Sequence, residues 1–398
     1  MAYIQEFTIK GLAGRDDVVH RVLDRNINVF WGLNGAGKTS LLKILNSALA
    51  NDTTLLRRVP FESAEVQFWS IRHEALIKRT FENSEDTRTE DSEDEFSDMP
   101  TLERVGEGLW RESWENKRTT WRSEVLLSKT DPRLDIAYRH TYLPISRMTQ
   151  VAAGRRSGVS SRNVAIDDEA LDADFADHVR RKWQSYTATA LTSIRGIQQQ
   201  GLASILALLF GGAAGPVAAP PEKVDAEQAY PLVRDFLTQQ GINLRIGKSE
   251  FTTKYENQPE LRSVVATIQE VEEEVSEATK PQREFRAVIQ KLYSGGKQLL
   301  FDHGKTVPGS LHVEWNGSTI PLESLSSGEK QLLRLMLETL SAEEDTLMVD
   351  EPELSMHVDW QQVLVESMRK VNPDCQLLLA THSPEVMAEV SPEFVFEL

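Results

Sequence analysis

The chain has 398 residues and a formal net charge of −17 at pH 7, with 40% hydrophobic and 26% charged residues. This length favours roughly two to three domains with a substantial core. The acidic balance excludes a surface that is basic throughout, so any contact with DNA or RNA must be local. The single cysteine, Cys375, excludes a disulfide within the chain and is expected to be a small core residue.

The N-terminus has no basic segment followed by an apolar one, and the longest apolar run, 202–219, is interrupted by glycine and proline. A signal peptide and a membrane span are therefore not expected. We expect a cytoplasmic protein without a membrane partner.

The first predicted elements lead into a glycine-rich loop. Residues 2–11 are expected to be an edge strand, 18–23 its partner, and 28–31 a short apolar strand. The segment from Gly32 to Thr39 matches the P-loop pattern G-x-x-x-x-G-K-[ST], and residues 40–49 have a helical period. A strand, a glycine loop and a helix N-terminus form a cradle of N–H groups for phosphate. The alternative is a glycine-rich turn that matches by chance.

The P-loop predicts ATP with Mg²⁺ as its ligand. Lys38 would reach the β- and γ-phosphates and take part in catalysis, and the Thr39 hydroxyl would be a Mg²⁺ ligand. The other nucleotide-binding residues predicted in this segment are Gly32, Asn34, Gly35, Gly37 and Ser40.

Two further strand-like runs, 64–71 and 74–81, are expected to continue the sheet. Gln67 in the first run lies about where many P-loop ATPases carry a glutamine that senses Mg²⁺, and we predict it as a metal ligand. A solvent-facing strand residue is the alternative.

Two polar segments follow. Residues 84–98 contain eight acidic residues and one arginine, which predicts a mobile surface loop, with an acidic docking peptide as the alternative. After a strand and turn expected over 136–148, residues 151–163 are rich in glycine and serine. This second segment is either a solvated loop or a phosphate-contacting loop. The latter is suggested by a cluster of arginines without acidic neighbours: Arg147, Arg155, Arg156 and Arg162.

The middle of the chain is predicted to be helical over 169–210, 225–240 and 260–293. The last helix carries an a/d-type seam of about two heptads, formed by Leu261, Val264, Ile268, Val271 and Val275. Because about two heptads are too few for an independent coiled coil, a helical arm or hairpin packed on itself is expected. Pro281 is expected to kink or divide this helix.

Residues 325–329, LSSGE, precede an amphipathic helix predicted over 329–340. Hydroxyl groups, a glycine N–H and a helix N-terminus are phosphate donors, so Ser326, Ser327 and Gly328 are predicted to form a second nucleotide-binding turn. The alternative is a purely structural capping box with Ser326 or Ser327 as N-cap.

Residues 346–353, TLMVDEPE, read as an apolar strand that ends in acids. Asp350, at the strand's end, is predicted to hold Mg²⁺. Glu351 is the predicted catalytic base, which would accept a proton from, or orient, the water that attacks the γ-phosphate. His382 follows another buried strand, 375–380, and alone would be read equally well as part of a capped turn.

In this order, the motifs resemble those of the ABC-type ATPases that include the structural-maintenance-of-chromosomes (SMC) proteins, the RecF-like repair ATPases and the overcoming-lysogenisation-defect family. LSSGE is similar to the LSGGQ signature, with Ser327 in place of the first glycine. His382 resembles the switch histidine that contacts the γ-phosphate, which makes it a predicted catalytic residue. In this family the signature meets the ATP held by another subunit, so the resemblance implies a homodimer or higher homo-oligomer with ATP in its interface.

The resemblance implies an α/β fold: an ABC-type P-loop ATPase head with a mixed β-sheet and a helical or coiled-coil insertion. We predict residues 1–148 as the N-terminal half of the head, 149–295 as the insertion and 296–398 as the C-terminal half. The motifs look closest to the overcoming-lysogenisation-defect family and its stand-alone relatives in phage-defence operons. That family carries a Toprim nuclease after the ATPase, and no such domain is expected after His382, so any cutting would come from a partner.

The leading functional hypothesis is an ATP-hydrolysing, ATP-dependently dimerising switch that controls a partner effector, a nuclease or toxin, or acts on nucleic acid in phage defence. A DNA-repair ATPase of the SMC type that binds DNA directly, or a scaffold with slow turnover, is the alternative. Phosphoryl transfer to a small molecule and a transport subunit fit the LSSGE motif and the long insertion less well.

Overall fold

The computed structural model describes residues 2–83, 101–106, 109–113, 121–128, 136–144, 168–210, 225–239, 241–293, 296–302 and 310–398. The chain divides into two compact units, which we call the head (Met1–Val179, Val288–Gln298 and Val313–Leu398) and the arm (Arg180–Ala287 and Leu299–His312). The acidic run 84–98 and the four predicted phosphate-contacting arginines, Arg147, Arg155, Arg156 and Arg162, lie outside the described residues.

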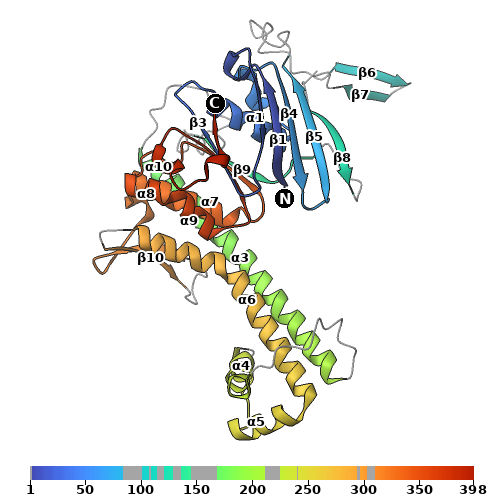
Figure 1. Ribbon diagram of the computed structural model, residues 1–398, viewed down its shortest axis with the longest axis vertical. Helices are drawn as coiled ribbons and strands as arrows, with labels where there is room; N and C mark the ends of the chain where they lie inside the picture. Colours follow the sequence, from blue (N-terminus) through green and yellow to red (C-terminus); the bar gives the residue numbers. More distant parts are fainter. Residues whose placement is uncertain are drawn as a thin grey trace. The chain divides into compact units, whose positions relative to one another are not determined.

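The head contains an antiparallel sheet with the strand order β2-β1-β4-β5-β8 (Figure 1). These strands are β1 (Ala2–Lys10), β2 (Val18–Val22), β4 (Ser63–Ser70), β5 (Ala75–Glu82) and β8 (Arg122–Ser128). Strands were predicted in the first four of these places, and those predictions are confirmed. The prediction that residues 2–11 form an edge strand is wrong, because β1 is paired with β2 on one side and with β4 on the other. A separate hairpin joins β6 (Thr101–Gly106) and β7 (Leu109–Ser113).

A second sheet in the head has the order β15-β3-β14-β13-β9, and every described pair of its strands is parallel. Its strands are β3 (Ile27–Trp31), β9 (His140–Leu143), β13 (Thr346–Asp350), β14 (Gln376–Thr381) and β15 (Val395–Glu397). The central strands β13 and β14 are buried at every residue, as expected for a parallel sheet covered on both faces. The strand that enters the P-loop therefore belongs to this sheet and not to the sheet of β1.

One hydrophobic core joins the two sheets through helix α1 (Lys38–Ala50), which packs against β4 of the first sheet and against β9, β13 and β14 of the second. Leu41, Leu42, Ile44 and Leu45 of α1 are fully buried. Their spacing of three and four is the apolar face that the sequence predicts. The core thus fixes the helix that follows the P-loop against both sheets.

Buried polar groups connect the ends of the sequence. The Gln376 amide, on β14, donates to the Ile4 carbonyl at 2.8 Å and accepts from the Ile4 N–H at 2.9 Å. The Thr346 hydroxyl lies 3.0 Å from both Oε1 of Gln376 and the Ala2 carbonyl oxygen and shares its one proton between these two acceptors. Because all of these groups are fully buried, each bond satisfies a donor or acceptor that would otherwise be costly.

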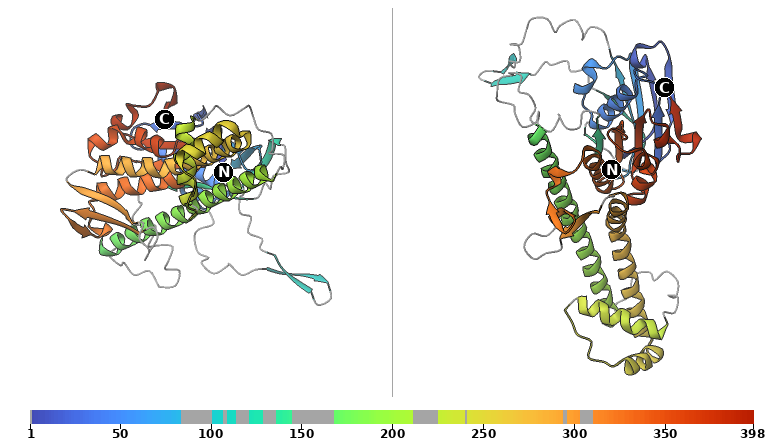
Figure 2. Two further views of the ribbon diagram at one scale, coloured as in Figure 1. Left: turned by 90° about the horizontal axis from the view of Figure 1, so that it is seen from below. Right: turned by 90° about the vertical axis from the view of Figure 1, so that its left-hand side faces the viewer.

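The arm is built around two long helices that lie side by side, α3 (Asp168–Leu209) and α6 (Pro259–Leu292), with α4 (Ala226–Gln239) and α5 (Lys248–Asn257) at one end of the pair (Figures 1 and 2). Three of these helices were predicted, and α5 was missed. The seam of α6 packs into the arm core with side chains of α4 and α5. It approaches α3 so closely that a Cβ on Gly201 would lie 2.1 Å from Val271. The predicted helical hairpin is confirmed.

Helix α6 continues through Pro281, so this proline does not divide the helix, and the other predicted outcome, a kink, stays a prediction. The helix continues because Pro281 removes a single hydrogen bond from a helix of 34 residues that is held by packing over much of its length.

The remaining elements follow α6 in the sequence. They include the small sheet β10 (Lys297–Asp302), β11 (Ser310–Trp315) and β12 (Ser318–Ile320), of which residues 299–312 belong to the arm. The helices α7 (Ser327–Ser341), α8 (Val358–Gln362), α9 (Leu364–Val371) and α10 (Pro384–Met387) belong to the head. Cys375 is buried, as predicted, and burial raises the pKa of its thiol to about 12. None of the described helices combines the length and the apolar character needed to cross a membrane.

Candidate ATP-binding and hydrolysis site

Three neighbouring parallel strands bring the predicted motifs to one edge of the head. Strand β3 leads into the P-loop, β13 ends at Asp350, and β14 is followed by His382. Since β14 pairs in parallel with both β3 and β13, the carboxyl ends of all three strands meet at the same edge. Ligands of open α/β sheets bind outside the carboxyl ends of the strands.

The P-loop ends at Gly37, the N-cap of α1, which has a left-handed backbone with φ of 97°. A Cβ on Gly37 would lie 3.1 Å from the Cβ of Ala13 and 3.2 Å from Cγ of Leu12, so conformation and packing both require glycine. Behind it, the first turn of α1 has N–H groups without a partner inside the helix and the positive end of the helix dipole. This arrangement favours an anion.

The other predicted nucleotide-binding residues of this segment occupy the same loop and turn. Asn34 and Gly35 are exposed, Gly32 is buried, and Thr39 and Ser40 are half-buried in the first turn of α1. A nucleotide could therefore approach the loop from its exposed side, where Asn34 and Gly35 lie.

The Lys38 side chain is buried inside the loop. Its Nζ donates to the Gly32 carbonyl at 2.8 Å and to the Leu33 carbonyl at 3.3 Å, and lies 3.8 Å from Oε1 of Glu351. The ammonium group thus contacts the backbone of the P-loop on one side and the Glu351 carboxylate, which follows β13, on the other.

Asp350 and Thr39 are the predicted Mg²⁺ ligands at this edge. Asp350 is fully buried at the last residue of β13, and Thr39 is in the first turn of α1, a helix that packs on β13. A carboxylate and a hydroxyl are the oxygen ligands that Mg²⁺ prefers. The chemistry of this donor set fits a Mg²⁺ ion bound together with a nucleotide.

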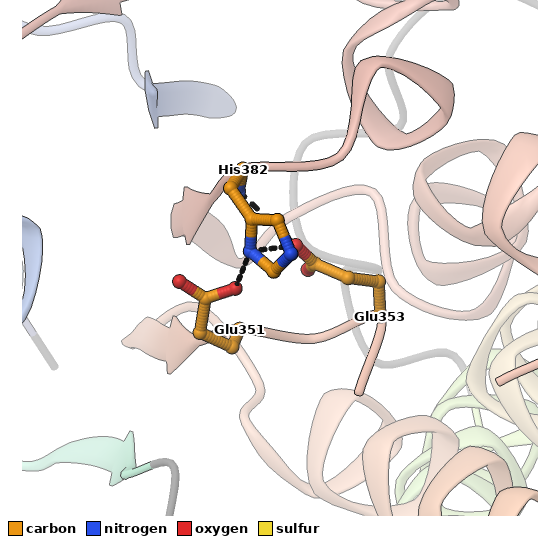
Figure 3. A group of neighbouring side chains, drawn as sticks. All are labelled: Glu351, Glu353 and His382. Carbon is orange, nitrogen blue, oxygen red and sulfur yellow. Dashed lines mark hydrogen bonds and ion pairs between the residues drawn. The ribbon is translucent and has the colours of Figure 1, made fainter. Parts of the chain in front are cut away.

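Glu351 follows directly, with a backbone φ of 52° that a non-glycine residue rarely adopts. Its N–H donates to the Ala380 carbonyl at 2.8 Å, which ties the residue to β14. The carboxylate contacts Lys38 through Oε1 and hydrogen-bonds Nδ1 of His382 through Oε2 (Figure 3). The structure therefore brings together the three residues predicted to be catalytic.

A residue that sequence reasoning did not assign to the site, Glu353, lies beside them. It is 5% exposed, and its Oε1 accepts hydrogen bonds from the Thr381 hydroxyl at 2.5 Å, the His382 N–H at 3.1 Å and the Ser383 N–H at 3.2 Å. The same oxygen is 3.3 Å from Nδ1 of His382. Glu353 thus fixes the segment that carries His382. The one signal in the sequence is a second acid two positions after Glu351.

The electrostatics of this cluster raise the pKa of one of its two carboxyl groups, that of Glu351. Burial raises the pKa of Glu351, and the neighbouring Glu353 carboxylate raises it further, while the hydrogen bond with His382 and its charge lower it in part. The net direction is upward, so Glu351 binds a proton more readily than a free glutamate. A raised pKa is what a carboxylate needs to accept a proton near neutral pH.

The predicted second nucleotide-binding turn begins helix α7. Ser326 is its N-cap and forms a reciprocal capping box with Glu329, whose carboxylate also pairs with Nζ of Lys297 at 2.8 Å. The structural alternative for this turn is therefore present. It does not compete with nucleotide binding, because Ser326 and Ser327 remain exposed. Gly328 lies against the backbone of Ser355, in the segment after β13.

Gln67 lies on β4 of the antiparallel sheet. Its amide donates to Glu6 at 2.5 Å and to Glu65 at 3.4 Å, and its neighbours Val66 and Phe68 point to the opposite, core-facing side of the strand. The structure does not place Gln67 with Lys38, Glu351 and His382, and its role as a metal ligand stays a prediction.

Two protein-family models match the chain. One is described as "AAA domain" and matches residues 8–142, and the other is described as "AAA domain, putative AbiEii toxin, Type IV TA system" and matches residues 247–388. The first range contains the P-loop, and the second contains the 326–328 turn, Asp350, Glu351 and His382. Both ranges are therefore similar to AAA domains, and both carry the motifs that resemble those of SMC/RecF-like P-loop ATPases.

The chain is also 27% identical over 186 residues to the Retron Vc95 probable ATPase of Vibrio cholerae serotype O1 biovar El Tor. The aligned part is 41% of this chain and 36% of that protein, so the match spans only about a third of the curated relative.

Among solved structures, the chain is similar to two Smc head domains at low identity. One has an extended coiled coil bound to the C-terminal domain of ScpA and derives from Pyrococcus furiosus (14% identity, 98% of this chain, 92% of that chain, TM-score 0.42). The other has a coiled coil and joint and derives from Pyrococcus yayanosii (12% identity, 98% of this chain, 93% of that chain, TM-score 0.41).

Proposed function

We propose that the chain hydrolyses ATP. The observation that carries this proposal is the position of the Glu351 carboxylate, 3.8 Å from the P-loop lysine through one oxygen and hydrogen-bonded to His382 through the other. A phosphate-binding lysine, a carboxylate with a raised pKa and an imidazole in contact with it form a set suited to the attack of water on a γ-phosphate.

The substrate that fits this site is ATP with Mg²⁺. Its phosphates would accept hydrogen bonds from the N–H groups of the loop. The Lys38 ammonium would then bind a phosphate oxygen in place of the Gly32 and Leu33 carbonyls. Thr39 and Asp350 would hold the ion. Glu351 would accept a proton from the attacking water while the bond between the γ-phosphorus and the bridging oxygen breaks, and Lys38 would stabilise the charge that develops. His382 would contact the γ-phosphate. Gln67 would reach Mg²⁺ only by leaving its glutamate partners.

We further propose that ATP joins two copies of the chain. Ser326, Ser327 and Gly328 would complete the nucleotide site of another copy, because two exposed serines at the N-terminus of a helix of 15 residues favour a phosphate. Binding of ATP would then assemble a homodimer or a higher homo-oligomer, and hydrolysis would release it, which is the behaviour of a switch.

The biological setting we propose is bacterial phage defence in the cytoplasm. It is supported by the match to a family described as "AAA domain, putative AbiEii toxin, Type IV TA system" and by the similarity to a probable retron ATPase. The switch would control an effector protein, a nuclease or toxin, and nucleic acid is the alternative ligand. The insertion 149–295 separates the head segments 1–148 and 296–398 in sequence, and we place the partner on it.

Steady-state ATP turnover of the full chain tests this proposal. We expect Glu351→Gln to lower kcat by about 10²–10⁴-fold, the range for loss of a general base. The matched control is Glu389→Gln, an exposed glutamate of the same region, which should hydrolyse ATP like the parent.

Light scattering of Glu351→Gln should show a rise in mass with ATP. Unchanged turnover in Glu351→Gln would contradict the assignment of the base, and a mass that ATP does not alter would contradict the ATP-driven dimer. Turnover with and without double-stranded DNA decides whether nucleic acid is a ligand.

A further inference from the structure

Glu351, Glu353 and His382 lie close enough together to bind one metal ion. One possible metal-ligating atom from each residue lies within 4.8 Å of the other two. Figure 3 shows both carboxylates turned toward the His382 ring. Nδ1 of His382 is their common contact, since it hydrogen-bonds Oε2 of Glu351 and lies 3.3 Å from Oε1 of Glu353.

The two carboxylates are almost completely removed from water, with Glu351 8% and Glu353 5% exposed. Buried carboxylates at close range repel each other, and a cation between them relieves that repulsion. The Lys38 ammonium lies 3.8 Å from Glu351 and also donates to the Gly32 and Leu33 carbonyls.

Glu353 has an oxygen available for such a cation. Its Oε1 already accepts hydrogen bonds from Thr381, His382 and Ser383. Its Oε2 is buried and accepts no hydrogen bond from any residue that the structure describes. A buried carboxylate oxygen without a donor is costly unless something else binds it.

We propose that Glu351, Glu353 and His382 bind a divalent transition-metal ion such as Zn²⁺ in the nucleotide-free chain. Two carboxylates and one neutral imidazole match the charge of a divalent ion, and one nitrogen with two oxygen ligands suits Zn²⁺, whereas Mg²⁺ prefers oxygen alone. Three protein ligands would leave a coordination position for water. This site uses neither of the predicted Mg²⁺ ligands, Asp350 and Thr39.

The consequence for activity rests on the proposed function. An ion held by Glu351 and His382 would occupy both the proton acceptor and the residue that contacts the γ-phosphate. Zn²⁺ would therefore inhibit hydrolysis, and Mg²⁺ in excess would not relieve the inhibition, because the two ions use different ligands.

Calorimetric titration of the full chain with ZnCl₂, without nucleotide, tests the site itself. We expect one ion to bind the parent with a dissociation constant at or below about 10 μM, and Glu353→Gln and His382→Asn each to weaken that binding at least tenfold, since loss of ligands or their supports costs such factors. The matched control is His357→Asn, an exposed histidine 3.3 Å from Asp359, which should bind Zn²⁺ like the parent. Circular dichroism verifies that each variant is folded, and Co²⁺ absorption reports the coordination geometry.

Failure of the metal site and failure of the proposed function are distinguishable, because the titration uses no ATP. Equal Zn²⁺ binding by the parent and both site variants, or no binding by the parent at 100 μM Zn²⁺ (about tenfold above the expected constant), would overturn the proposed site. Binding without inhibition of ATP turnover in the parent would overturn its role as an inhibitor. Zn²⁺ binding by a chain that never hydrolyses ATP would leave the site standing and refute only the proposed function.

Discussion

The backbone carbonyl oxygen of Ser355 lies so close to Gly328 that a Cβ built on the glycine would be 2.5 Å from it. Gly328 is in the first turn of α7, and Ser355 belongs to the segment that follows β13, so this contact joins the LSSGE turn to the segment after Glu351. Trp360 covers the same position, with its Cζ3 3.4 Å from the built Cβ. A methyl group therefore does not fit unless backbone moves.

Gly328→Ala should destabilise the chain by about 1–3 kcal/mol, the cost of overpacking a filled site. The gain in helix propensity from alanine, about 1 kcal/mol at most, is too small to offset it. Urea unfolding measures the difference. Gly196→Ala in α3 is the matched control, because a Cβ there meets nothing within 4 Å, and this variant should be slightly more stable than the parent. A Gly328→Ala chain as stable as the parent would show that the Ser355 carbonyl moves freely.

Glu351→Gln should gain stability relative to the parent as the pH rises. The pKa of Glu351 is raised in the folded chain, so the folded state retains its proton at pH values where the unfolded state has lost it. The parent therefore loses stability as the pH rises from about 4.5, the ordinary pKa of a glutamate, to the raised pKa of Glu351 in the folded chain. Glutamine does not ionise, so the Glu351→Gln variant does not lose this stability. Below about pH 4 both states of the parent are protonated and the pH-dependent difference disappears.

The measurement is urea unfolding of the parent and Glu351→Gln at pH 4.5, 6 and 7.5, because the stability difference between them is expected to grow above about pH 4.5. Glu389→Gln, at an exposed position, should show no such trend. A stability difference between parent and Glu351→Gln that is constant over this range would contradict the upward direction of the pKa.

Arg79→Met should cost about 2–4 kcal/mol, because it leaves several buried carbonyls without a donor. The Arg79 side chain is fully buried on β5 and donates to the carbonyls of Ala48 and Leu49 in the last turn of α1, and to the Ile136 carbonyl at 2.8 Å. Burial lowers the pKa of Arg79 to about 10, so the guanidinium stays charged at neutral pH.

Thermal and urea unfolding compare Arg79→Met with Arg72→Met, an exposed arginine in the turn before β5, for which a change within about 0.5 kcal/mol is expected. Equal stability of the two variants would mean that water replaces the guanidinium at the end of α1.

The P-loop, the LSSGE turn and the strands around them could be predicted because each depends on residues that are close in sequence. Gly37 must be glycine because its backbone is left-handed, and Ser326 caps the helix that begins one residue later. Helix α5 escaped prediction because it carries two buried aromatic residues, Phe251 and Tyr255, in an otherwise polar segment. A spacing of four between them was the available signal.

The role of Glu353 could not be predicted in the same way. Its partners, Thr381, His382 and Ser383, are about 30 residues further on and reach it only because β13 and β14 are neighbours. The contact between Gly328 and Ser355 likewise depends on where α7 packs. The membership of β1 in a sheet separate from that of β3 is also a tertiary property, because a period of two does not say which strands pair.

Ser327→Glu should block assembly of two copies without harming the fold. Ser327 is exposed at the first position of α7, where an acidic side chain interacts favourably with the helix dipole by about 0.3–1 kcal/mol. If this turn meets the γ-phosphate of ATP held by another copy, the added carboxylate repels it. We expect the double variant Ser327→Glu/Glu351→Gln to bind ATP through its own P-loop but to show no rise in mass with ATP, whereas Ser327→Ala/Glu351→Gln should still assemble.

A mixing experiment decides whether Lys38 and the 326–328 turn act from different copies. In a head-to-tail dimer, each nucleotide site takes Lys38 from one chain and the turn from the other. Lys38→Ala and Ser327→Glu chains should each lack turnover alone. Their heterodimer would contain one site with both defects and one intact site, so the mixture should recover turnover, at most about half of the parental rate if the two sites are independent. If the turn instead serves the P-loop of its own chain, every site in the mixture carries a defect and no activity returns.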